Sequence, residues 1–282
     1  MKSILFFSII FSLAFFNISC NRNNENPIST QHNFVVVLDL SDRLLNANQK
    51  EKDSCMIMAT FKEFEDSARK TLILTSTDRF SVRIIPQKNS PLQQDYFENK
   101  LSLDLSKIDA AHKNSDFEKL KKELPNLIAT LYHQANLGVK SDNYFGVDIW
   151  KFFNNEMNDE LMADAINKVI VITDGYFDFN DNTHVLQQKN KYTSTQFLNA
   201  LTMNDWQTKA SIDDVGLVPV NISKKTKWVI VGLQSKNQND IEMEQKLEYF
   251  WQKWLIESNQ SKPKFILNNA CKVMIEQYFS RY

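Results

Sequence analysis

Residues 34–43 of this 282-residue chain read Phe-Val-Val-Val-Leu-Asp-Leu-Ser-Asp-Arg, an apolar run that ends in polar residues. Five consecutive apolar side chains are typical of a parallel strand buried on both faces of its sheet. Residues 169–175 repeat this arrangement as Val-Ile-Val-Ile-Thr-Asp-Gly. Because the carboxyl ends of parallel strands lie at one edge of a sheet, the sequence predicts that the polar residues after these two strands meet there.

The remainder of the chain alternates between strand and helix patterns. Further strands are predicted at 80–85, 101–105, 228–233 and 265–267, with 101–105 at the edge of the sheet. Helices are predicted at 50–72, 117–135, 148–153, 194–201, 241–258 and 273–282. Pro125 interrupts the second of these helices, and we expect it to start a new segment. Buried strands alternating with helices predict one α/β domain over residues 33–282, with a central, mostly parallel sheet flanked by helices on both faces.

The first 32 residues have the pattern of an export signal followed by a short tether. Lys2 precedes an apolar run over residues 4–16, which is shorter than the roughly 18–20 residues that cross a bilayer. We therefore expect residues 1–19 to be a cleaved signal peptide and residues 20–32 to be a polar tether. An uncleaved membrane anchor and a buried N-terminal helix are the alternatives.

Residues 17–20, Asn-Ile-Ser-Cys, resemble the lipobox of bacterial lipoproteins, in which a small residue precedes the cysteine that receives a diacylglyceryl group. Asn17 departs from this pattern, because an aliphatic residue is usual there. The resemblance implies an exported protein that lipid on Cys20 anchors to a membrane. Asn21 follows the cysteine where an aspartate would retain an enterobacterial lipoprotein at the inner membrane, so the outer membrane is favoured.

Composition excludes some partner classes and leaves others open. The formal net charge is −1 and the charged residues are interspersed, so the sequence has no basic stripe for nucleic acid. After the expected cleavage, Cys55 and Cys271 accompany Cys20 in the mature chain. They form one disulfide in an oxidising compartment or remain two free thiols. No Cys and His spacing predicts a zinc site.

Three segments together resemble the von Willebrand factor A family. They are Asp39-Leu40-Ser41-Asp42-Arg43, Gly146-Val147-Asp148-Ile149 and Thr173-Asp174-Gly175. The metal-ion-dependent adhesion site of that family uses an Asp-x-Ser-x-Ser motif, a threonine and a later aspartate. By position, Asp39, Ser41 and Asp174 match ligands of this site, which implies a Rossmann-like fold and a bound Mg²⁺ or Mn²⁺. Carboxylate and hydroxyl oxygens are hard ligands that suit such ions.

Two positions depart from the family's motif. Arg43 stands where the second serine belongs, and Val147 replaces the threonine, with Ser141 as a possible substitute. A guanidinium has no acceptor atom and cannot bind a metal. Arg43 either neutralises Asp39 and Asp174 through bidentate hydrogen bonds, or points outward and leaves water to complete a metal shell. The motif thus predicts either a working metal site or a degenerate one.

The resemblance favours a non-enzymatic, envelope-located module that binds another protein. Arg43, Asp148, Tyr176 and Phe177 are the candidate partner contacts, with core or loop packing as the alternative for the two aromatics. A second hypothesis is a metal-dependent hydrolase, because a strand that ends in Asp also opens haloacid-dehalogenase-type phosphatases. Ser41 occupies the place of their second aspartate and cannot act as the general acid. A third hypothesis is a scaffolding subunit of an envelope complex.

Overall fold

The structure is a computed structural model of the chain. It describes residues 30–87, 90–140, 146–179, 187–202, 205–237 and 240–266. Several predictions fall outside these ranges, namely the signal peptide at residues 1–19, lipidation of Cys20 and a helix at 273–282. Cys55 is disulfide-bonded, whereas Cys271 is not among the described residues. Within those ranges, no helix is both long enough and apolar enough to cross a membrane.

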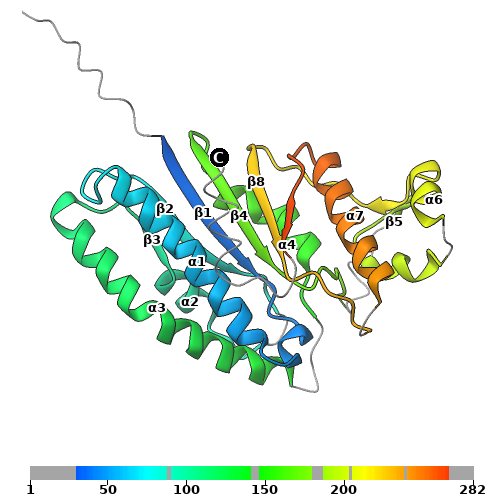
Figure 1. Cartoon of the computed structure of the whole chain (residues 1–282), viewed down its shortest axis with the longest axis horizontal. Helices are drawn as coiled ribbons and strands as arrows, with labels where there is room; N and C mark the ends of the chain where they lie inside the picture. Colours follow the sequence, from blue (N-terminus) through cyan, green and yellow to red (C-terminus); the bar gives the residue numbers. More distant parts are fainter. Residues whose placement is uncertain are drawn as a thin grey trace, which may run out of the picture.

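A six-stranded sheet forms the centre of the molecule (Figure 1). Its strands are β1 (Gln31–Leu38), β2 (Arg79–Ile84), β3 (Ser102–Asp104), β4 (Ala165–Ile172), β8 (Thr226–Val231) and β9 (Lys264–Ile266). They lie in the order β3-β2-β1-β4-β8-β9, and every pairing is parallel except that of β2 with β3. The fold is therefore Rossmann-like α/β, as the sequence predicts. The von Willebrand factor A assignment itself stays a prediction.

Strand β1 lies inside the sheet, between β2 and β4. Its register with β4 runs from Gln31 opposite Ala165 to Leu38 opposite Ile172. All side chains from Asn33 to Leu38 are buried, because helices cover both faces of the sheet. The strand begins at Gln31, so the last two residues of the predicted tether belong to β1.

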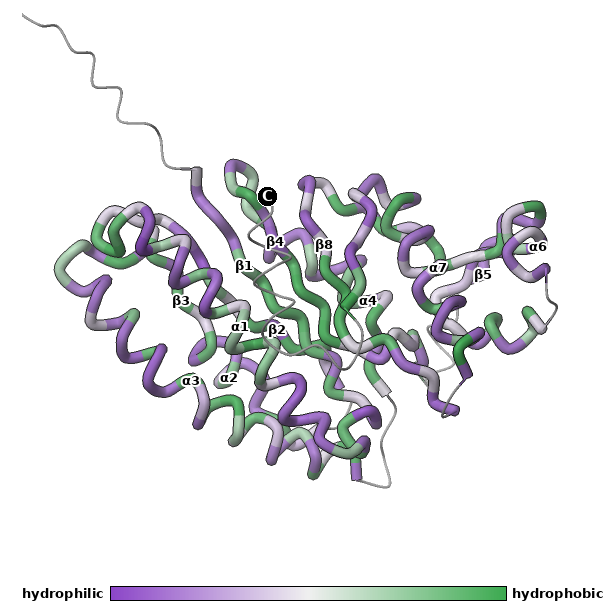
Figure 2. Tube along the Cα trace, viewed as in Figure 1, coloured by the Kyte–Doolittle hydropathy of each residue, from purple (hydrophilic) through white to green (hydrophobic). Residues whose placement is uncertain are grey.

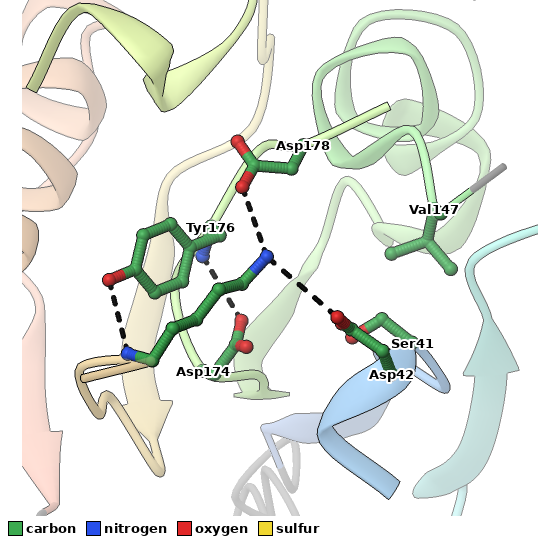
Figure 3. Close-up of a pocket in the computed structure, with 8 residues that line it drawn as sticks. Ser41, Asp42, Val147, Asp174, Tyr176 and Asp178 are labelled. Carbon is green, nitrogen blue, oxygen red and sulfur yellow. Dashed lines mark hydrogen bonds and ion pairs between the residues drawn. The ribbon is translucent and has the colours of Figure 1, made fainter. Parts of the chain in front are cut away.

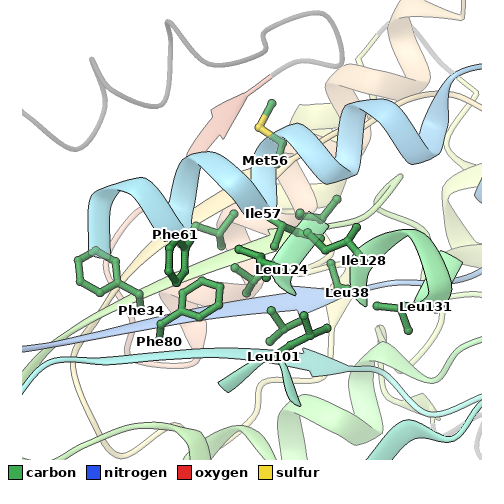
Figure 4. Close-up of a cluster of buried hydrophobic side chains, with 14 of the residues drawn as sticks. Phe34, Leu38, Met56, Ile57, Phe61, Phe80, Leu101, Leu124, Ile128 and Leu131 are labelled. Atoms are coloured by element: carbon green, nitrogen blue, oxygen red, sulfur yellow. The ribbon is translucent and has the colours of Figure 1, made fainter. Parts of the chain in front are cut away.

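One face of the sheet is covered by α1 (Gln49–Lys70), α2 (Gln94–Lys100) and α3 (Ala110–Val139). Phenylalanines from three elements meet in this layer, with Phe61 of α1 against Phe80 of β2 and Phe117 of α3 at 5.2 and 5.6 Å between ring centroids. Figure 4 shows Phe34 and Phe80 of the sheet facing Phe61 of α1. Truncating one such phenylalanine to alanine costs about 3–5 kcal/mol, so this cluster accounts for much of the stability of the layer.

The opposite face is covered by α4 (Ile149–Asn155), α5 (Met157–Glu160) and α7 (Ile241–Glu257). Phe153 of α4 packs on Trp228 of β8 and on Trp254 of α7, with ring centroids 5.6 and 5.0 Å apart. Trp251 and Trp254 are fully buried, as the amphipathic pattern of this helix predicts. Figure 2 shows the apolar strands enclosed between helices whose outer surfaces are hydrophilic.

The prediction that Pro125 starts a new segment is wrong. Helix α3 runs without a break from Ala110 to Val139 and contains Pro125 in its middle. The proline lies on the exposed side, whereas Leu124 and Ile128 on the inner side are buried. The hydrogen bond that proline removes is thus lost on the solvent side of the helix, where water can satisfy the freed carbonyl. Burial of the apolar side offsets the cost.

A segment inserted between β4 and β8 forms a small lobe beside α7 (Figure 1). It contains β5 (Gln187–Gln188), β6 (Lys191–Tyr192), β7 (Gly216–Leu217), a 3-10 helix η3 (Thr195–Ala200) and α6 (Trp206–Ile212). The sequence predicts a helix at 194–201, and the structure has a 3-10 helix there. Trp206 of α6 packs edge-on against Tyr249 of α7 at 5.3 Å, which attaches the lobe to the domain.

Candidate functional site

A cavity of about 70 Å³ lies at the carboxyl ends of β1 and β4, and we call it the strand-end cavity. The strand order switches direction between these two strands, and open α/β sheets place their binding sites at such points. The lining residues are Ser41, Asp42, Gly146, Val147, Asp174, Tyr176, Asp178 and Lys236. Figure 3 shows the three aspartates and Tyr176 arranged around one space.

Asp39 lies beneath the cavity and is completely buried. One carboxylate oxygen accepts a hydrogen bond from the Ser41 backbone N–H at 2.9 Å, and the other accepts one from the Thr173 hydroxyl at 2.7 Å. Burial raises the pKa of Asp39, while Arg43 and these hydrogen bonds act in the opposite direction. The carboxylate thus joins the end of β1 to the end of β4 and fixes the floor of the cavity.

The surroundings of Asp174 disfavour the negative charge of its carboxylate. Its side chain is 6% exposed and lines the cavity. One carboxylate oxygen accepts a hydrogen bond from the Tyr176 backbone N–H at 3.2 Å. Burial, reinforced by the neighbouring Asp39 carboxylate, raises the pKa of Asp174 to about 7. The surroundings therefore stabilise the negative charge of this carboxylate poorly.

Lys236, from the loop between β8 and α7, reaches the rim of the cavity. Its ammonium lies 3.1 Å from the Asp178 carboxylate, 3.9 Å from that of Asp42 and 4.8 Å from the centre of the Tyr176 ring. The Lys236 backbone N–H also donates to the Tyr176 hydroxyl at 3.3 Å. The rim therefore already holds an ammonium between carboxylates and an aromatic face.

Arg43 does not bond to the side chains of Asp39 and Asp174, so that prediction is wrong. Its guanidinium is buried and forms a bidentate pair with Asp53 of α1, at 2.8 and 2.9 Å. It reaches Asp39 through the backbone oxygen, at 3.0 Å. The outward orientation considered as the alternative is wrong too, because Arg43 is only 3% exposed. This burial leaves the guanidinium little surface for a partner.

Two further side chains complete the group that we call the Arg43 network. Gln49 and the Tyr132 hydroxyl each donate to the Asp53 carboxylate at 2.8 Å. Burial and the Asp53 carboxylate raise the pKa of Tyr132 well above its usual range, which keeps the hydroxyl protonated as a donor. The network connects the turn after β1 with α1 and α3, and it supports the floor of the cavity from below.

The residues present are a poor fit for a resident Mg²⁺ or Mn²⁺. Ser41 and Asp174 line the cavity, but Val147 contributes an apolar side chain at the threonine position. Both oxygens of Asp39 already accept hydrogen bonds, and the ammonium of Lys236 lies among the remaining carboxylates. A divalent ion at this place would meet the ammonium of Lys236, which already contacts Asp178. Ser141, the possible substitute ligand, lies outside the described residues.

The candidate partner contacts other than Arg43 differ in their exposure and in their position relative to the cavity. Tyr176 is half-buried and lines the cavity. Phe177 is 2% exposed and packs on Trp251 and Trp254 with ring centroids 4.9 Å away in both cases, which is the core packing given as the alternative for this aromatic. Asp148 caps helix α4 by accepting a hydrogen bond from the Lys151 backbone N–H at 2.9 Å. It does not line the cavity.

The sequence reasoning missed Asp53 and Lys236. Lys236 follows the carboxyl end of the predicted strand 228–233, so the rule that found Asp174 would have included it. Asp53 had a weaker signal, namely its place on the inner face of α1 one turn after Gln49. Its pairing with Arg43 depends on how α1 rotates against the turn after β1, which sequence spacing does not specify.

Two glycines shape the loops around the cavity. Gly146 has φ +85°, and a Cβ there would lie 2.3 Å from the Asp178 carbonyl oxygen. Gly175 has φ +98°, and a Cβ there would lie 2.5 Å from a methyl group of Leu233. Only glycine adopts these conformations without strain. Gly146 thereby brings the segment before α4 against the loop after β4, where it forms a bridge with Phe179.

Neither a family model nor a curated protein matches the sequence. Among solved structures, the chain is similar to a pilus adhesin, SpaC from Lactobacillus rhamnosus GG in its open conformation. The identity is 11% and the TM-score is 0.39, with 89% of this chain and 29% of the adhesin chain covered. The chain thus spans less than a third of that protein. A likeness this distant carries no argument about function.

Proposed function

We propose that this chain is a protein-binding module of the bacterial cell envelope, anchored by lipid on Cys20. It binds its partner through the strand-end cavity and the rim formed by Asp42, Tyr176, Asp178 and Lys236. The observation that carries the proposal is a small cavity at the switch point of the sheet, with charged and aromatic side chains at its mouth. Aromatic and charged groups around a partly desolvated pocket are typical of interface anchors.

The hydrolase hypothesis has less support at this site. A nucleophilic Asp39 would need an accessible carboxylate oxygen, but this side chain is fully buried and both oxygens accept hydrogen bonds. Ser41 stands two residues later, where a phosphatase of that class needs a carboxylic acid. Turnover of a phosphate or carboxylic ester by the full chain, abolished by Asp39→Asn, would support the enzyme instead.

Matched charge reversals test the binding face. Asp42 at the rim and Asp66 on α1 have nearly equal side-chain exposure, 48% and 47%, and each contacts a lysine. We expect full-length Asp66→Arg to retain partners from envelope extracts at the wild-type level, measured by quantitative mass spectrometry of crosslinked complexes. Asp42→Arg should retain at least about tenfold less, since a like charge at an interface opposes association. Equal retention by both variants would contradict binding through this face.

The same capture experiment tests metal dependence. A binding face without a resident ion predicts equal retention in excess Mg²⁺ and in excess chelator. Retention that chelator abolishes, and that Mg²⁺ or Mn²⁺ restores, would favour Asp39, Ser41 and Asp174 as metal ligands despite their poor fit. Heat and a thermal shift on adding Mg²⁺ to the wild type, absent in Asp174→Ala, would support the same conclusion.

Membrane attachment needs its own test, because Cys20 lies outside the described residues. The proposal predicts a mature N-terminal peptide that carries a diacylglyceryl group on Cys20, detected by mass spectrometry. Cys20→Ser should leave the chain unlipidated and move it from the membrane fraction to the soluble fraction, since stable anchoring needs the acyl chains. A chain that stays in the membrane fraction after this substitution would contradict the lipid anchor.

A further inference from the structure

The charges that line the strand-end cavity do not balance. Two of the lining residues, Asp174 and Asp178, are aspartates that share one lysine, Lys236. The nearby guanidinium of Arg43 adds no net charge, because Asp53 pairs with it in a bidentate manner. The site thus carries an excess of negative charge in a partly buried place, which favours a cationic occupant.

Asp174 supplies a second and independent indication. Asp174 is more than nine-tenths buried as a residue and lines the cavity, yet among the described residues its carboxylate accepts a hydrogen bond only from the Tyr176 backbone N–H. A buried carboxylate normally accepts several hydrogen bonds, because it loses its hydration on folding. Asp174 therefore retains capacity for a donor that enters the cavity.

Lys236 shows which donor the rim accepts. Its ammonium contacts Asp178, Asp42 and the face of the Tyr176 ring, which is the geometry of an ammonium site with a cation–π contact. It is also weakly held, since its side chain is 44% exposed and it donates one short contact, to Asp178 at 3.1 Å. An ammonium has three donors, so two remain for water. An incoming ammonium can replace this contact.

The site also has room for a second side chain. A cavity of about 320 Å³ adjoins the strand-end cavity and shares Asp42, Asp174 and Lys236 with it. Its other walls include Leu45, whose side chain is largely exposed and apolar, and Ser235. This volume lies at the lower end of the range for ligand sites. The aliphatic part of a long basic side chain can lie along Leu45 while its charged end reaches Asp174.

We propose that the strand-end cavity binds the ammonium group of a lysine side chain on the partner protein, and that Lys236 occupies this site as an internal competitor in the free chain. The inference rests on the proposed binding function and adds the chemistry of the partner group. The incoming ammonium donates to Asp178 and to the free oxygen of Asp174, while Lys236 moves into solvent. Binding exchanges one exposed ion pair for a more buried one.

Removal of the competitor tests the inference. The probe is Nα-acetyl-lysine amide, titrated by calorimetry into the full chain as wild type, Lys236→Met and Lys236→Met with Asp178→Asn. Lys62→Met is the matched control, because Lys62 is 51% exposed and pairs with Asp66. We expect Lys236→Met to bind the probe about fivefold more tightly than the wild type or the control, the factor that corresponds to one exposed ion pair. The added Asp178→Asn should cancel this gain.

Three outcomes would overturn the inference. The first is equal affinity of Lys236→Met and the wild type for the probe. The second is equal binding of the neutral analogue Nα-acetyl-norleucine amide, which would make the site apolar rather than ammonium-selective. The third is tighter binding of Nα-acetyl-arginine amide, or of Mg²⁺ alone, which would assign the cavity to another cation. These titrations use no partner, so their failure is distinct from failure of the capture experiment with Asp42→Arg.

Discussion

The Arg43 network and the strand-end cavity lie near each other at the carboxyl end of β1. They differ in how many hydrogen-bond and ion-pair partners their charged side chains have. In the Arg43 network, the guanidinium meets Asp53 in a bidentate pair, and Gln49 and Tyr132 donate to the same carboxylate. At the strand-end cavity, Asp174 is buried with one hydrogen bond among the described residues. The charges of the Arg43 network therefore have several partners each, whereas the Asp174 carboxylate can still accept further hydrogen bonds.

The difference separates a structural role from a binding role. Buried charges that all have partners hold elements in place, because removing one partner leaves the other without compensation. A buried charge that lacks partners costs stability in the free protein, and such a cost is typical of functional sites. The Arg43 network should therefore govern stability, whereas the strand-end cavity should govern binding. The following predictions test this division in order of expected effect.

Loss of Asp53 should have the largest effect. Asp53→Ala leaves the buried Arg43 guanidinium without its carboxylate, which costs about 3–5 kcal/mol in the free energy of unfolding. Chemical denaturation of the full chain measures this loss. The double variant Arg43→Met with Asp53→Leu should recover most of it, since no buried charge then remains unpaired. A loss below about 1 kcal/mol for Asp53→Ala would show that the Arg43 network does not stabilise the fold.

Asp174→Asn should change stability in the opposite direction. The amide keeps the hydrogen bond from the Tyr176 backbone N–H and removes a poorly solvated charge, so the free energy of unfolding should rise by about 1–3 kcal/mol at pH 8. Binding of Nα-acetyl-lysine amide to the Lys236→Met background should weaken at the same time. A variant that loses stability at this pH would show that the charge of Asp174 is compensated after all.

The same variant has a pH signature. The pKa of Asp174 in the folded chain, about 7, lies above its usual value of 3.8 because of burial. Between these values the folded chain holds a proton that the unfolded chain has released. The free energy of unfolding should therefore decrease as the pH rises from about 4 to about 7, and Asp174→Asn should flatten this decrease. Denaturation curves at four or five pH values measure it, and parallel wild-type and variant profiles would contradict it.

Tyr132→Phe should cost less than Asp53→Ala. The substitution removes one of the donors to Asp53 and leaves Arg43 and Gln49 in place. The expected loss is about 1.5–3 kcal/mol, typical of one hydrogen bond to a charged group. Tyr96→Phe is the matched control, because Tyr96 is 48% exposed. A loss near that of Asp53→Ala would mean that the hydroxyl, rather than the ion pair, holds the network together.

The fold was predictable where burial on both faces imposes a continuous apolar run. The predicted strands at 34–38, 169–173 and 228–233 each lie within two residues of β1, β4 and β8 at their carboxyl ends. The small lobe was not predictable in the same way, because its strands are two residues long and show no periodicity. Pro125 misled the helix prediction because its local penalty is smaller than the gain from packing α3.

The sequence predicted which residues lie at the site, but it did not predict which residue pairs with Arg43. The strand-end rule brings Ser41 and Asp174 to one cavity and puts Asp39 beneath them, as expected. It could not indicate that Arg43 turns toward Asp53, since that depends on three-dimensional packing of α1 and α3. The burial of Phe177 against two tryptophans is likewise a tertiary effect that an aromatic cluster in a loop does not reveal.

The smallest effect on stability is expected for Lys236→Met. A small effect is what a binding role of the strand-end cavity predicts, in contrast to the structural role of the Arg43 network. Lys236 and Lys62 each hold an exposed ion pair, with 44% and 51% of the side chain accessible. Solvent screens both pairs, so either substitution should change the free energy of unfolding by less than about 1 kcal/mol. Lys236→Met alone should increase the affinity for Nα-acetyl-lysine amide. A stability loss above about 2 kcal/mol for Lys236→Met would mean that the lysine is a structural cation of the cavity, satisfied like Arg43, and the contrast between the two groups would disappear.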